Sequence, residues 1–481
     1  MTIIGAIDSV ITRLADAADN VLIPYKSIAV GLLVAQTAFE LYIIRRQLPC
    51  YSRPLPPPEL KNHMTAEKYK KAQAYSRDKT YYSIAQHIFS FFQSLIFIKG
   101  GYLWTWNFAG KIMDALGISR NHMITYTLIW TVVTTLISGA LSLPWSYYYT
   151  FVLEEKHGFN KQTPKLFFMD TLKTYSLIAV LGLPVLAGFL KIFDWAGKAF
   201  IPWLMLFVIA VQLVLQIIFP LWIQPLFNKF TPLPEGEVRS RVEALATRLH
   251  FPLKHLFMID GSKRSSHSNA YFYGLPWSKQ IVIYDTLMDK SSPAEVEAVL
   301  AHELGHWYYS HPMRLMLIAQ AHLLFTLAVF SVFIGNKALF ASFGFDPALA
   351  VGPPRAVCIG FTLYQLLFGP IDTFVQFAMN SRTRKYEYQA DAFAVQLGTK
   401  ADLKTALIKL HVENLSSPHS DKLYSMYHHS HPTLPERLRA MDEYTGGNWL
   451  EPKAAHPARL ATTEQKKEEE REREIEEKKE L

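Results

Sequence analysis

The chain has 481 residues and a formal net charge of +8, and half of its residues are apolar while only 19% are charged. A soluble enzyme usually carries about a quarter charged residues, so this composition favours a membrane protein. The excess Lys and Arg form no basic-aromatic array, and we therefore expect no nucleic-acid partner. Two distant cysteines, Cys50 and Cys358, exclude a disulfide framework and a cysteine-based metal site.

Seven segments are apolar and long enough to cross a lipid bilayer, which takes about 20 residues per helix. They cover residues 24–44, 82–108, 123–149, 174–194, 199–225, 313–335 and 355–379. The first begins too late for a signal peptide and lacks the basic start and the cleavage site of one. Polar residues inside several segments indicate either hydrogen bonds between packed helices or a wet interior. We predict an all-α polytopic protein with seven membrane helices.

The charge of the loops predicts the orientation of these helices. Residues 45–80 hold nine Lys or Arg, whereas the next loop holds two. Residues 150–173 again carry four Lys, and the short loop after the fourth segment has one. Cytosolic loops are enriched in Lys and Arg. We therefore expect the N-terminus in the lumen, and residues 226–312 and everything after residue 380 in the cytosol.

The segment 226–312 has the pattern of a soluble α+β structure. An amphipathic helix is predicted over residues 237–250. A further helix begins near Pro293, with Ser291 or Ser292 as its N-cap and Glu295 in its first turn. Three short strands are predicted between the two helices, at residues 255–259, 269–273 and 280–284.

The rest of the chain completes the expected organisation. Residues 381–445 predict two or three further helices, and the polar, charged end is expected to be a solvated helix or disordered. The predicted parts are five membrane helices in 1–225, a soluble segment in 226–312, two membrane helices in 313–380, a second soluble segment in 381–450 and a charged tail in 451–481.

The helix that begins near Pro293 contains the motif H-E-x-x-H, as Ala-His-Glu-Leu-Gly-His-Trp at residues 301–307. On a helix, His302 and His306 project from one face and can bind one metal ion. Glu303 lies about 100° further round the helix, where it can reach a water on the metal and act as a general base. The spacing therefore predicts the zinc site of a hydrolase.

A catalytic zinc takes three protein ligands and keeps one position open. Glu387 is the best candidate for the third ligand, because it follows the last membrane segment as directly as His302 precedes the sixth. Both residues can therefore lie at the same face of the membrane. Asp391 lies one helical turn after Glu387, where its carboxylate can accept the outer N–H of a ligating histidine and fix its tautomer.

Two residues near the end of the soluble part are further candidates. A hydrolase needs a donor for the oxyanion of its tetrahedral intermediate, and the ring of His431 can supply one, so we assign it a catalytic role. Arg437 could orient the substrate or could simply pair with its neighbour Glu436.

Residues 265–272 are predicted to form an exposed edge strand, with an ordinary hairpin as the alternative. An extended peptide can add to such an edge by main-chain hydrogen bonds, which would place its scissile carbonyl over the metal. Asn269 and Ala270 are the expected substrate-binding residues, and Asn269 would add side-chain hydrogen bonds.

At these residues the chain resembles the type I CAAX prenyl proteases, integral-membrane zinc endopeptidases of the endoplasmic reticulum. The resemblance extends through nearly the whole chain and includes Glu-Lys-His-Gly-Phe-Asn at 155–160, residues 265–274, Glu-Tyr-Gln-Ala-Asp at 387–391 and Ser-His-Pro at 430–432. It implies seven helices that form a barrel around a large water-filled chamber. It also implies a gluzincin-like domain that holds one zinc through His302, His306 and Glu387.

The resemblance further implies the substrate. Members of this family cleave farnesylated proteins or peptides that end in CAAX after the prenylated cysteine, which releases the last three residues. In fungi the substrates include a mating pheromone precursor, which is also cut at an N-terminal site. The last four residues, Lys478 to Leu481, resemble a dilysine retrieval signal for membrane proteins of the endoplasmic reticulum. Chance is the alternative, because the tail is rich in Lys and Glu.

Two other classes of protein share parts of this pattern. A membrane quality-control zinc protease has the same motif, but we expect it to be shorter and to have fewer membrane helices. A polytopic transporter or receptor could hold a structural zinc, but such a site is closed by four protein ligands and needs no Glu303.

Overall fold

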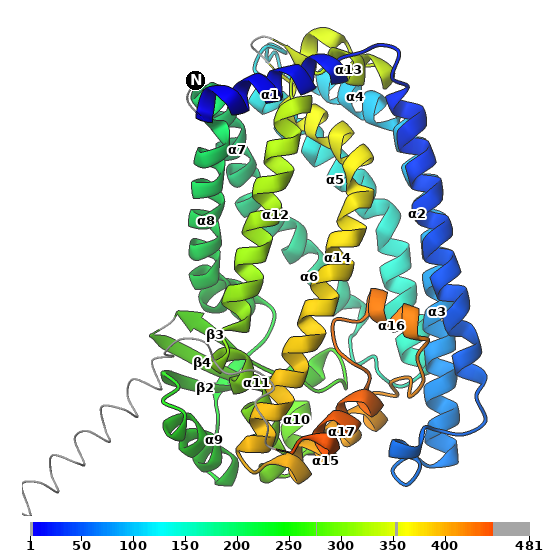
Figure 1. Ribbon diagram of the computed structural model, residues 1–481, viewed down its shortest axis with the longest axis vertical. Coiled ribbons are helices and arrows are strands. Elements are labelled where there is room, and N and C mark those ends of the chain that lie inside the picture. Colours follow the sequence, from blue (N-terminus) through cyan, green and yellow to red (C-terminus); the bar gives the residue numbers. More distant parts are fainter. Residues whose placement is uncertain (1–2, 276, 352–354, 446–481) are drawn as a thin grey trace, which may run out of the picture.

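The computed structural model describes residues 3–275, 277–351 and 355–445 of the chain. Long helices stand side by side along the molecule, and a small mixed domain closes one end of them (Figure 1). The predicted dilysine signal lies outside the described residues.

The helices of the first half are α1 Ile3–Ala18, α2 Tyr25–Gln47, α3 Ala66–Ile96, α4 Tyr102–Ala115, α5 Met123–Tyr148, α6 Pro164–Leu177, α7 Leu183–Ala196 and α8 Phe200–Ile218. Those of the second membrane part are α12 His311–Phe333, α13 Lys337–Ser342 and α14 Val357–Gln396.

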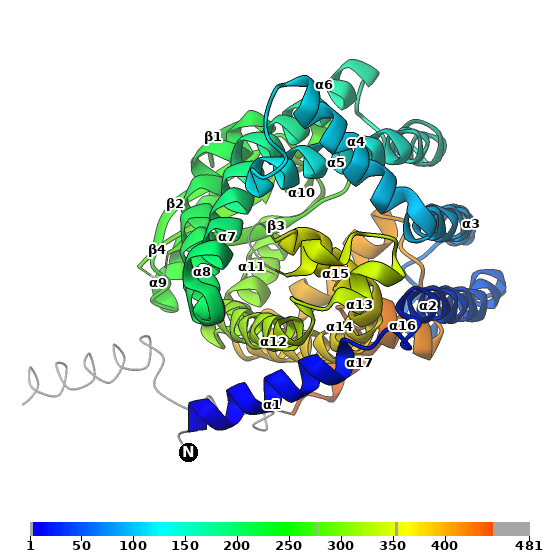
Figure 2. The same ribbon diagram turned by 90° about the horizontal axis from the view of Figure 1, so that it is seen from above.

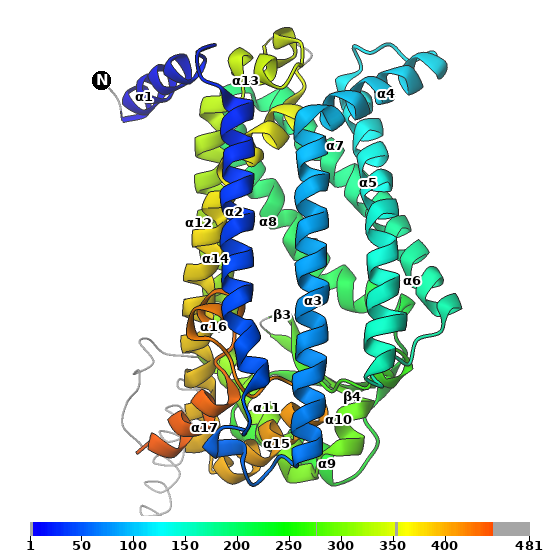
Figure 3. The same cartoon turned by 90° about the vertical axis from the view of Figure 1, so that its right-hand side faces the viewer.

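Six of the described helical segments are long and apolar enough to cross a membrane, and each overlaps a predicted span. They are Tyr25–Ser52, Met123–Glu154, Pro164–Ala196, Phe200–Leu226, His311–Phe333 and Val357–Gln396. The predicted span at residues 82–108 differs, because α3 begins in the charged loop at Ala66 and the chain kinks at Gly100 before α4. Nevertheless, α3 stands in the same row as α2 and α5 (Figure 3).

The membrane helices form a ring when the molecule is seen from above (Figure 2). Helix α2 packs against α3 and α14, while α8 packs against α7 and α12. Helix α12 in turn contacts α14, which closes this side of the ring. The arrangement is the helical barrel that the resemblance implied.

Polar side chains on neighbouring membrane helices bond to one another. The amide Nε2 of Gln320 donates to Oε1 of Gln212 over 2.7 Å, and His322 Nε2 lies 3.2 Å from Asp372 Oδ1. These pairs correspond to the hydrogen-bonding interpretation of the polar residues in the predicted spans. Both cysteines are free, as expected.

Helix α14 is longer than the sequence predicted. We expected a membrane helix to end near residue 379 and separate helices to follow, but α14 continues without a break to Gln396. No glycine or proline occurs between residues 371 and 396, and Ala390 and Ala394 are fully buried against the soluble core. The last membrane segment and Glu387 therefore share one rigid element.

The mixed domain contains a four-stranded sheet in the order β1-β2-β4-β3. Its strands are β1 Phe230–Pro232, β2 Leu253–Ile259, β3 Ala270–Leu275 and β4 Ser278–Tyr284. Strands β2 and β4 are parallel, and the other two pairs are antiparallel. Strand β3 is an edge strand, but it begins at Ala270 rather than at residue 265. Residues 264–266 pair instead with the segment 159–161, through Lys161 N–H to Arg264 O at 3.1 Å and Ser266 N–H to Phe159 O at 3.3 Å.

Helix α11 is the central element of this domain. The domain's helices are α9 Glu237–Arg248, α10 Asp285–Lys290, α11 Pro293–Tyr308, α15 Lys400–Glu413, α16 Lys422–His428 and α17 Leu434–Glu443. Ser292 and Glu295 form a capping box that fixes the start of α11. Leu300 and Leu304 on α11 are almost fully buried in a core shared by the sheet, α9, α15 and α17. The H-E-x-x-H helix is thus held by this core on the side that carries Leu300 and Leu304.

Candidate metal centre

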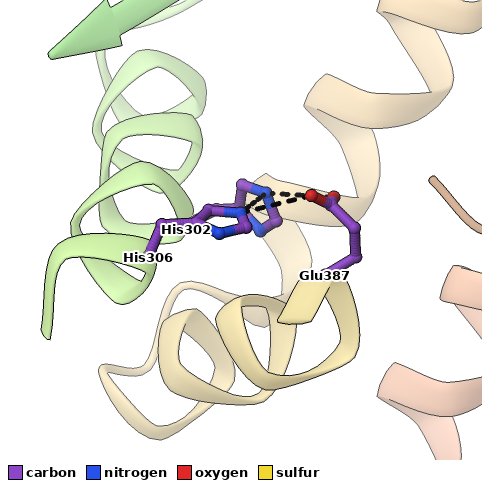
Figure 4. A group of neighbouring side chains, drawn as sticks. All are labelled: His302, His306 and Glu387. Carbon is purple, nitrogen blue, oxygen red and sulfur yellow. Dashed lines mark hydrogen bonds and ion pairs between the residues drawn. The ribbon is translucent and has the colours of Figure 1, made fainter. Parts of the chain in front are cut away.

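Helices α11 and α14 cross closely at Gly305. A Cβ atom at this position would lie 3.1 Å from the Cα of Ala390, so a larger residue would push the two helices apart. The close approach brings His302 and His306 of α11 opposite Glu387 of α14, and the three side chains point toward one another (Figure 4). The glycine inside the motif is therefore required by packing.

The three side chains form a group that suits a metal ion. Their potential ligand atoms all lie within 4.8 Å of one another. Nε2 of His302 is 3.3 Å from Nε2 of His306, and the two nitrogens lie 3.5 Å and 3.3 Å from the carboxylate oxygens of Glu387. Glu387 Oε2 is buried without a hydrogen-bond partner, an arrangement that is costly unless a cation binds there. Two imidazoles and one carboxylate therefore fit a divalent metal.

Asp391 and Arg437 lie behind His302. Asp391 Oδ1 is 2.9 Å from His302 Nδ1, and Arg437 donates to both oxygens of Asp391 over 2.6 Å and 2.8 Å. With its Nδ1–H donated to Asp391, His302 presents the lone pair of Nε2 to the metal position. Burial and Arg437 lower the pKa of His302, but the acidic side chains of Asp391 and Glu387 raise it by more, to about 9. The site thus stabilises positive charge.

The structure places Arg437 differently from both sequence interpretations. Its guanidinium is buried, bonds to Asp391 and lies 3.6 Å from Glu387 Oε2. Neighbouring Glu436 accepts instead from Arg384 over 3.1 Å. Arg437 therefore supports the residues around the metal position from behind, because the guanidinium is occupied by these acidic side chains.

His311 and Gln389 orient His306 in the same way, and no sequence pattern indicated either residue. His311 Nδ1 lies 3.0 Å from His306 Nδ1, and His311 Nε2 lies 2.9 Å from Oε1 of Gln389. Because an amide oxygen only accepts, His311 carries its proton on Nε2 and its Nδ1 accepts the N–H of His306. His306 therefore also presents Nε2 to the metal position. His311 follows a left-handed turn at Ser310, so no helical spacing relates it to the motif.

The front of the metal position opens into a cavity of about 480 Å³. Glu303, His431 and strand β3 line it. Nε2 of His431 is 3.3 Å from Glu387 Oε1, while its side chain is 62% exposed toward this space. Desolvation by the surrounding protein lowers the pKa of His431, so the ring is neutral at pH 7. Glu303 and His431 thus lie where a substrate carbonyl would approach.

The two expected substrate-binding residues begin the edge strand. Asn269 Oδ1 accepts the backbone N–H of Ala270 over 2.8 Å, and the methyl group of Ala270 is buried in the core. Tyr284 N–H donates to the backbone oxygen of Asn269. By the alternation of an antiparallel ladder, the main-chain groups of Ala270 and Phe272 then point to the free edge. Ala270 can contact a peptide only through its backbone.

An H-E-x-x-H helix that faces a glutamate, opens on one side and lies beneath a ring of membrane-length helices defines a membrane-embedded metallopeptidase. Residues 47–229 match the CAAX prenyl protease N-terminal family with five membrane helices, and residues 232–445 match Peptidase family M48. The chain therefore belongs to the CAAX prenyl proteases of Peptidase family M48, a family of metalloproteases.

Individual relatives cover nearly the whole chain. CAAX prenyl protease 1 of Saccharomyces cerevisiae is 42% identical over 439 residues, which are 88% of this chain and 96% of the relative. The CAAX prenyl protease 1 homolog of Homo sapiens is 37% identical over 452 residues, covering 85% of this chain and 94% of the relative. The crystal structure of S. mikatae Ste24p matches with a TM-score of 0.82 and 42% identity over 87% of this chain and 99% of that one. These matches do not favour the transporter or quality-control alternatives.

Proposed function

We propose that this protein is a zinc-dependent endopeptidase that cleaves farnesylated CAAX proteins or peptides after the prenylated cysteine and releases the last three residues. A second, N-terminal cut in a prenylated pheromone precursor belongs to the same proposal. The convergence of His302, His306 and Glu387 within 4.8 Å of one another is the observation that carries it. The names of the matched relatives supply the substrate class.

The residues of the site support specific roles as metal ligands, general base and oxyanion donor. We assign the two histidines and Glu387 as zinc ligands, because zinc accepts nitrogen and carboxylate ligands together. Zinc, when bound, would polarise the scissile carbonyl and acidify the attacking water. Glu303 would take the proton of that water and later deliver it to the amine of the released tripeptide. His431 would donate its neutral N–H to the developing oxyanion.

The soluble parts would act as one catalytic domain. Residues from 226–312 and from 381–445 share a single buried core, with Leu245 and Leu300 from the first part and Leu403 and Met441 from the second. We infer that the two last membrane helices are an insertion between the halves of a metalloprotease domain. The free edge of β3 would hold the substrate main chain beside α11.

We expect one zinc per purified chain and chelator-sensitive cleavage of a farnesylated CAAX peptide. Removal of the ion should abolish release of the C-terminal tripeptide, because carbonyl polarisation and water activation are lost together. Mass spectrometry of the products and metal analysis of the same sample provide the measurement. Added zinc should restore activity. Full turnover by protein shown to contain no zinc would contradict the proposal.

His431→Ala is expected to lower kcat by roughly 10²–10³ with a smaller change in KM, the pattern of a lost oxyanion donor. His122→Ala is the matched control, because His122 is exposed at the start of α5 and lines neither the cavity in front of the metal position nor the larger one beside it. Steady-state kinetics with the farnesylated peptide would separate the two constants. A change in KM alone would assign His431 to substrate binding instead.

We further propose that the protein resides in the endoplasmic reticulum membrane, with a lumenal N-terminus and the metal site on the cytosolic side. Asn414-Leu415-Ser416 is a glycosylation sequon, and this orientation predicts that it remains unmodified. A glycosidase mobility-shift assay in a eukaryotic host would test this. The control is Leu22→Ser, which creates an acceptor at Asn20 and should add a glycan. A shift that is lost in Asn414→Gln would reverse the proposed orientation.

A further inference from the structure

A second, larger cavity of about 750 Å³ lies beside the metal position. His431 lines both cavities, so they meet at this residue. The walls of the larger cavity come from α3, the end of α15, α16 and the segment that carries His431. Figure 3 shows the lower part of α3 beside the helices of the mixed domain. The volume lies in the range of small-ligand sites.

This cavity contains a cation that forms no ion pair with any residue that the structure describes. The side chain of Lys79 on α3 is exposed within it, and its ammonium lies 4.9 Å from the ring centroid of Tyr75. Among the residues that the structure describes, no carboxylate lies within ion-pair distance of Lys79. The neighbouring Glu154 is engaged by Tyr75, which donates to it over 2.6 Å, and by His267 at 3.6 Å. The charge of Glu154 acts on Lys79 only from beyond ion-pair distance, so the direct contacts of the ammonium remain open to a ligand.

A second unpaired group lies within the wall of the same cavity. Nε2 of His411 on α15 is buried and has no hydrogen-bond partner within the described chain. Burial lowers the pKa of His411 to about 4, so the ring is neutral at pH 7 and its Nε2 can carry a donor N–H. Buried polar groups are nearly always satisfied. The exposed ammonium of Lys79 therefore offers the direct contact for an anionic ligand, while Nε2 of His411 is sealed within the wall.

The polarity of strand β3 gives the direction in which a bound peptide would run. An antiparallel peptide on its free edge would pass from Gly274 toward Ala270. Gly274 lies at the membrane side, where its carbonyl accepts from Gln216 of α8 over 3.3 Å. Beyond Ala270 the chain leads to His267, which lines the larger cavity. The part before the scissile bond would thus face the membrane helices, and the part after it would face Lys79.

We propose that Lys79 binds the C-terminal carboxylate of the substrate and so favours a free C-terminus in the cut that releases the last three residues; the N-terminal cut would not use this contact. This inference rests on the proposed function, in which three residues follow the scissile bond. Three extended residues span about 10 Å, and the two cavities meet at His431. A carboxylate is the anion that every such substrate presents at this distance from the cut.

The test compares two farnesylated peptides that differ only in a C-terminal carboxylate or carboxamide. The zinc-loaded, full-length protein should cleave the carboxylate peptide with a kcat/KM roughly 10- to 100-fold higher, the range of a charged hydrogen bond. Lys79→Met should remove this preference by raising KM for the carboxylate peptide alone, and Lys79→Arg should retain part of it. The matched control is Lys71→Met on the same helix, because Lys71 is exposed and pairs with Glu67.

Binding to the Glu303→Gln protein provides a second measurement that needs no turnover. In this protein, Lys79→Met should lower the affinity for the carboxylate peptide and leave the affinity for the carboxamide peptide unchanged. Equal effects on both peptides, or no preference in the unmodified protein, would overturn the proposal. If the unmodified protein bound both peptides but cleaved neither, the proposed function would fail, and the binding difference would still decide the role of Lys79.

Discussion

Glu303→Gln is expected to lower hydrolysis by roughly 10²–10⁴ while the protein keeps its zinc. Glu303 lines the cavity in front of the metal position, but it is not one of the three side chains that converge there. The substitution therefore removes the base and no ligand. Single-turnover cleavage of a farnesylated peptide and metal analysis of the same preparation would measure both properties.

Glu297→Gln is the matched control for this experiment. Glu297 lies on the same helix, but its carboxylate pairs with Arg241 over 2.9 Å at the outer side. The control variant should keep both zinc and activity. If Glu303→Gln turned over at the unmodified rate, another group would have to serve as the base. If it lost zinc, Glu303 would have to be counted among the ligands.

Asp391→Ala is expected to weaken zinc binding roughly 10- to 100-fold and to destabilise the protein by about 3–5 kcal/mol. The change takes away the acceptor that orients His302 and leaves the buried guanidinium of Arg437 without its bidentate partner. Competition with a zinc chelator and thermal unfolding of the solubilised protein measure the two effects separately.

The control for Asp391→Ala is Asp442→Ala. Asp442 pairs with Lys400 and Lys404, but its side chain is 55% exposed, and such surface pairs contribute little to stability. A loss of stability in Asp391→Ala without any change in zinc affinity would mean that the Asp391–Arg437 pair serves the fold alone. A loss of zinc affinity without any loss of stability would mean that the pair serves only to orient His302.

Hydropathy predicted most of the fold, because crossing a bilayer imposes a length and a composition that a single sequence displays. The predicted bounds were wrong for helices that change environment along their length. Helix α3 begins in the charged loop and rises into the ring, so its apolar half is diluted by polar residues. Helix α14 passes from the membrane into the soluble core without a break. Local composition cannot show that continuity, because both environments accept a helix.

The site was predictable only to the extent that helical spacing determines it. His302, Glu303 and His306 follow from the motif, and the position of Asp391 follows from its distance of four residues from Glu387. Gln389 could not be found in this way, because residues two apart face different sides of a helix. Its contact with His311 arises from the packing of α12 against α11 and α14. Arg437 reaches Asp391 from another element, which no local pattern indicates.

The unbroken α14 also connects the metal position to the membrane part of the chain. Glu387 lies 17 residues beyond Pro370, a lever arm of about 25 Å at 1.5 Å per residue. A change in inclination of about 2° at the proline would carry the carboxylate through about 1 Å, several times the tolerance of a metal–ligand bond. Membrane helices adjust their tilt to bilayer thickness. We therefore expect the acyl-chain length of the surrounding lipids to alter the zinc affinity of the protein.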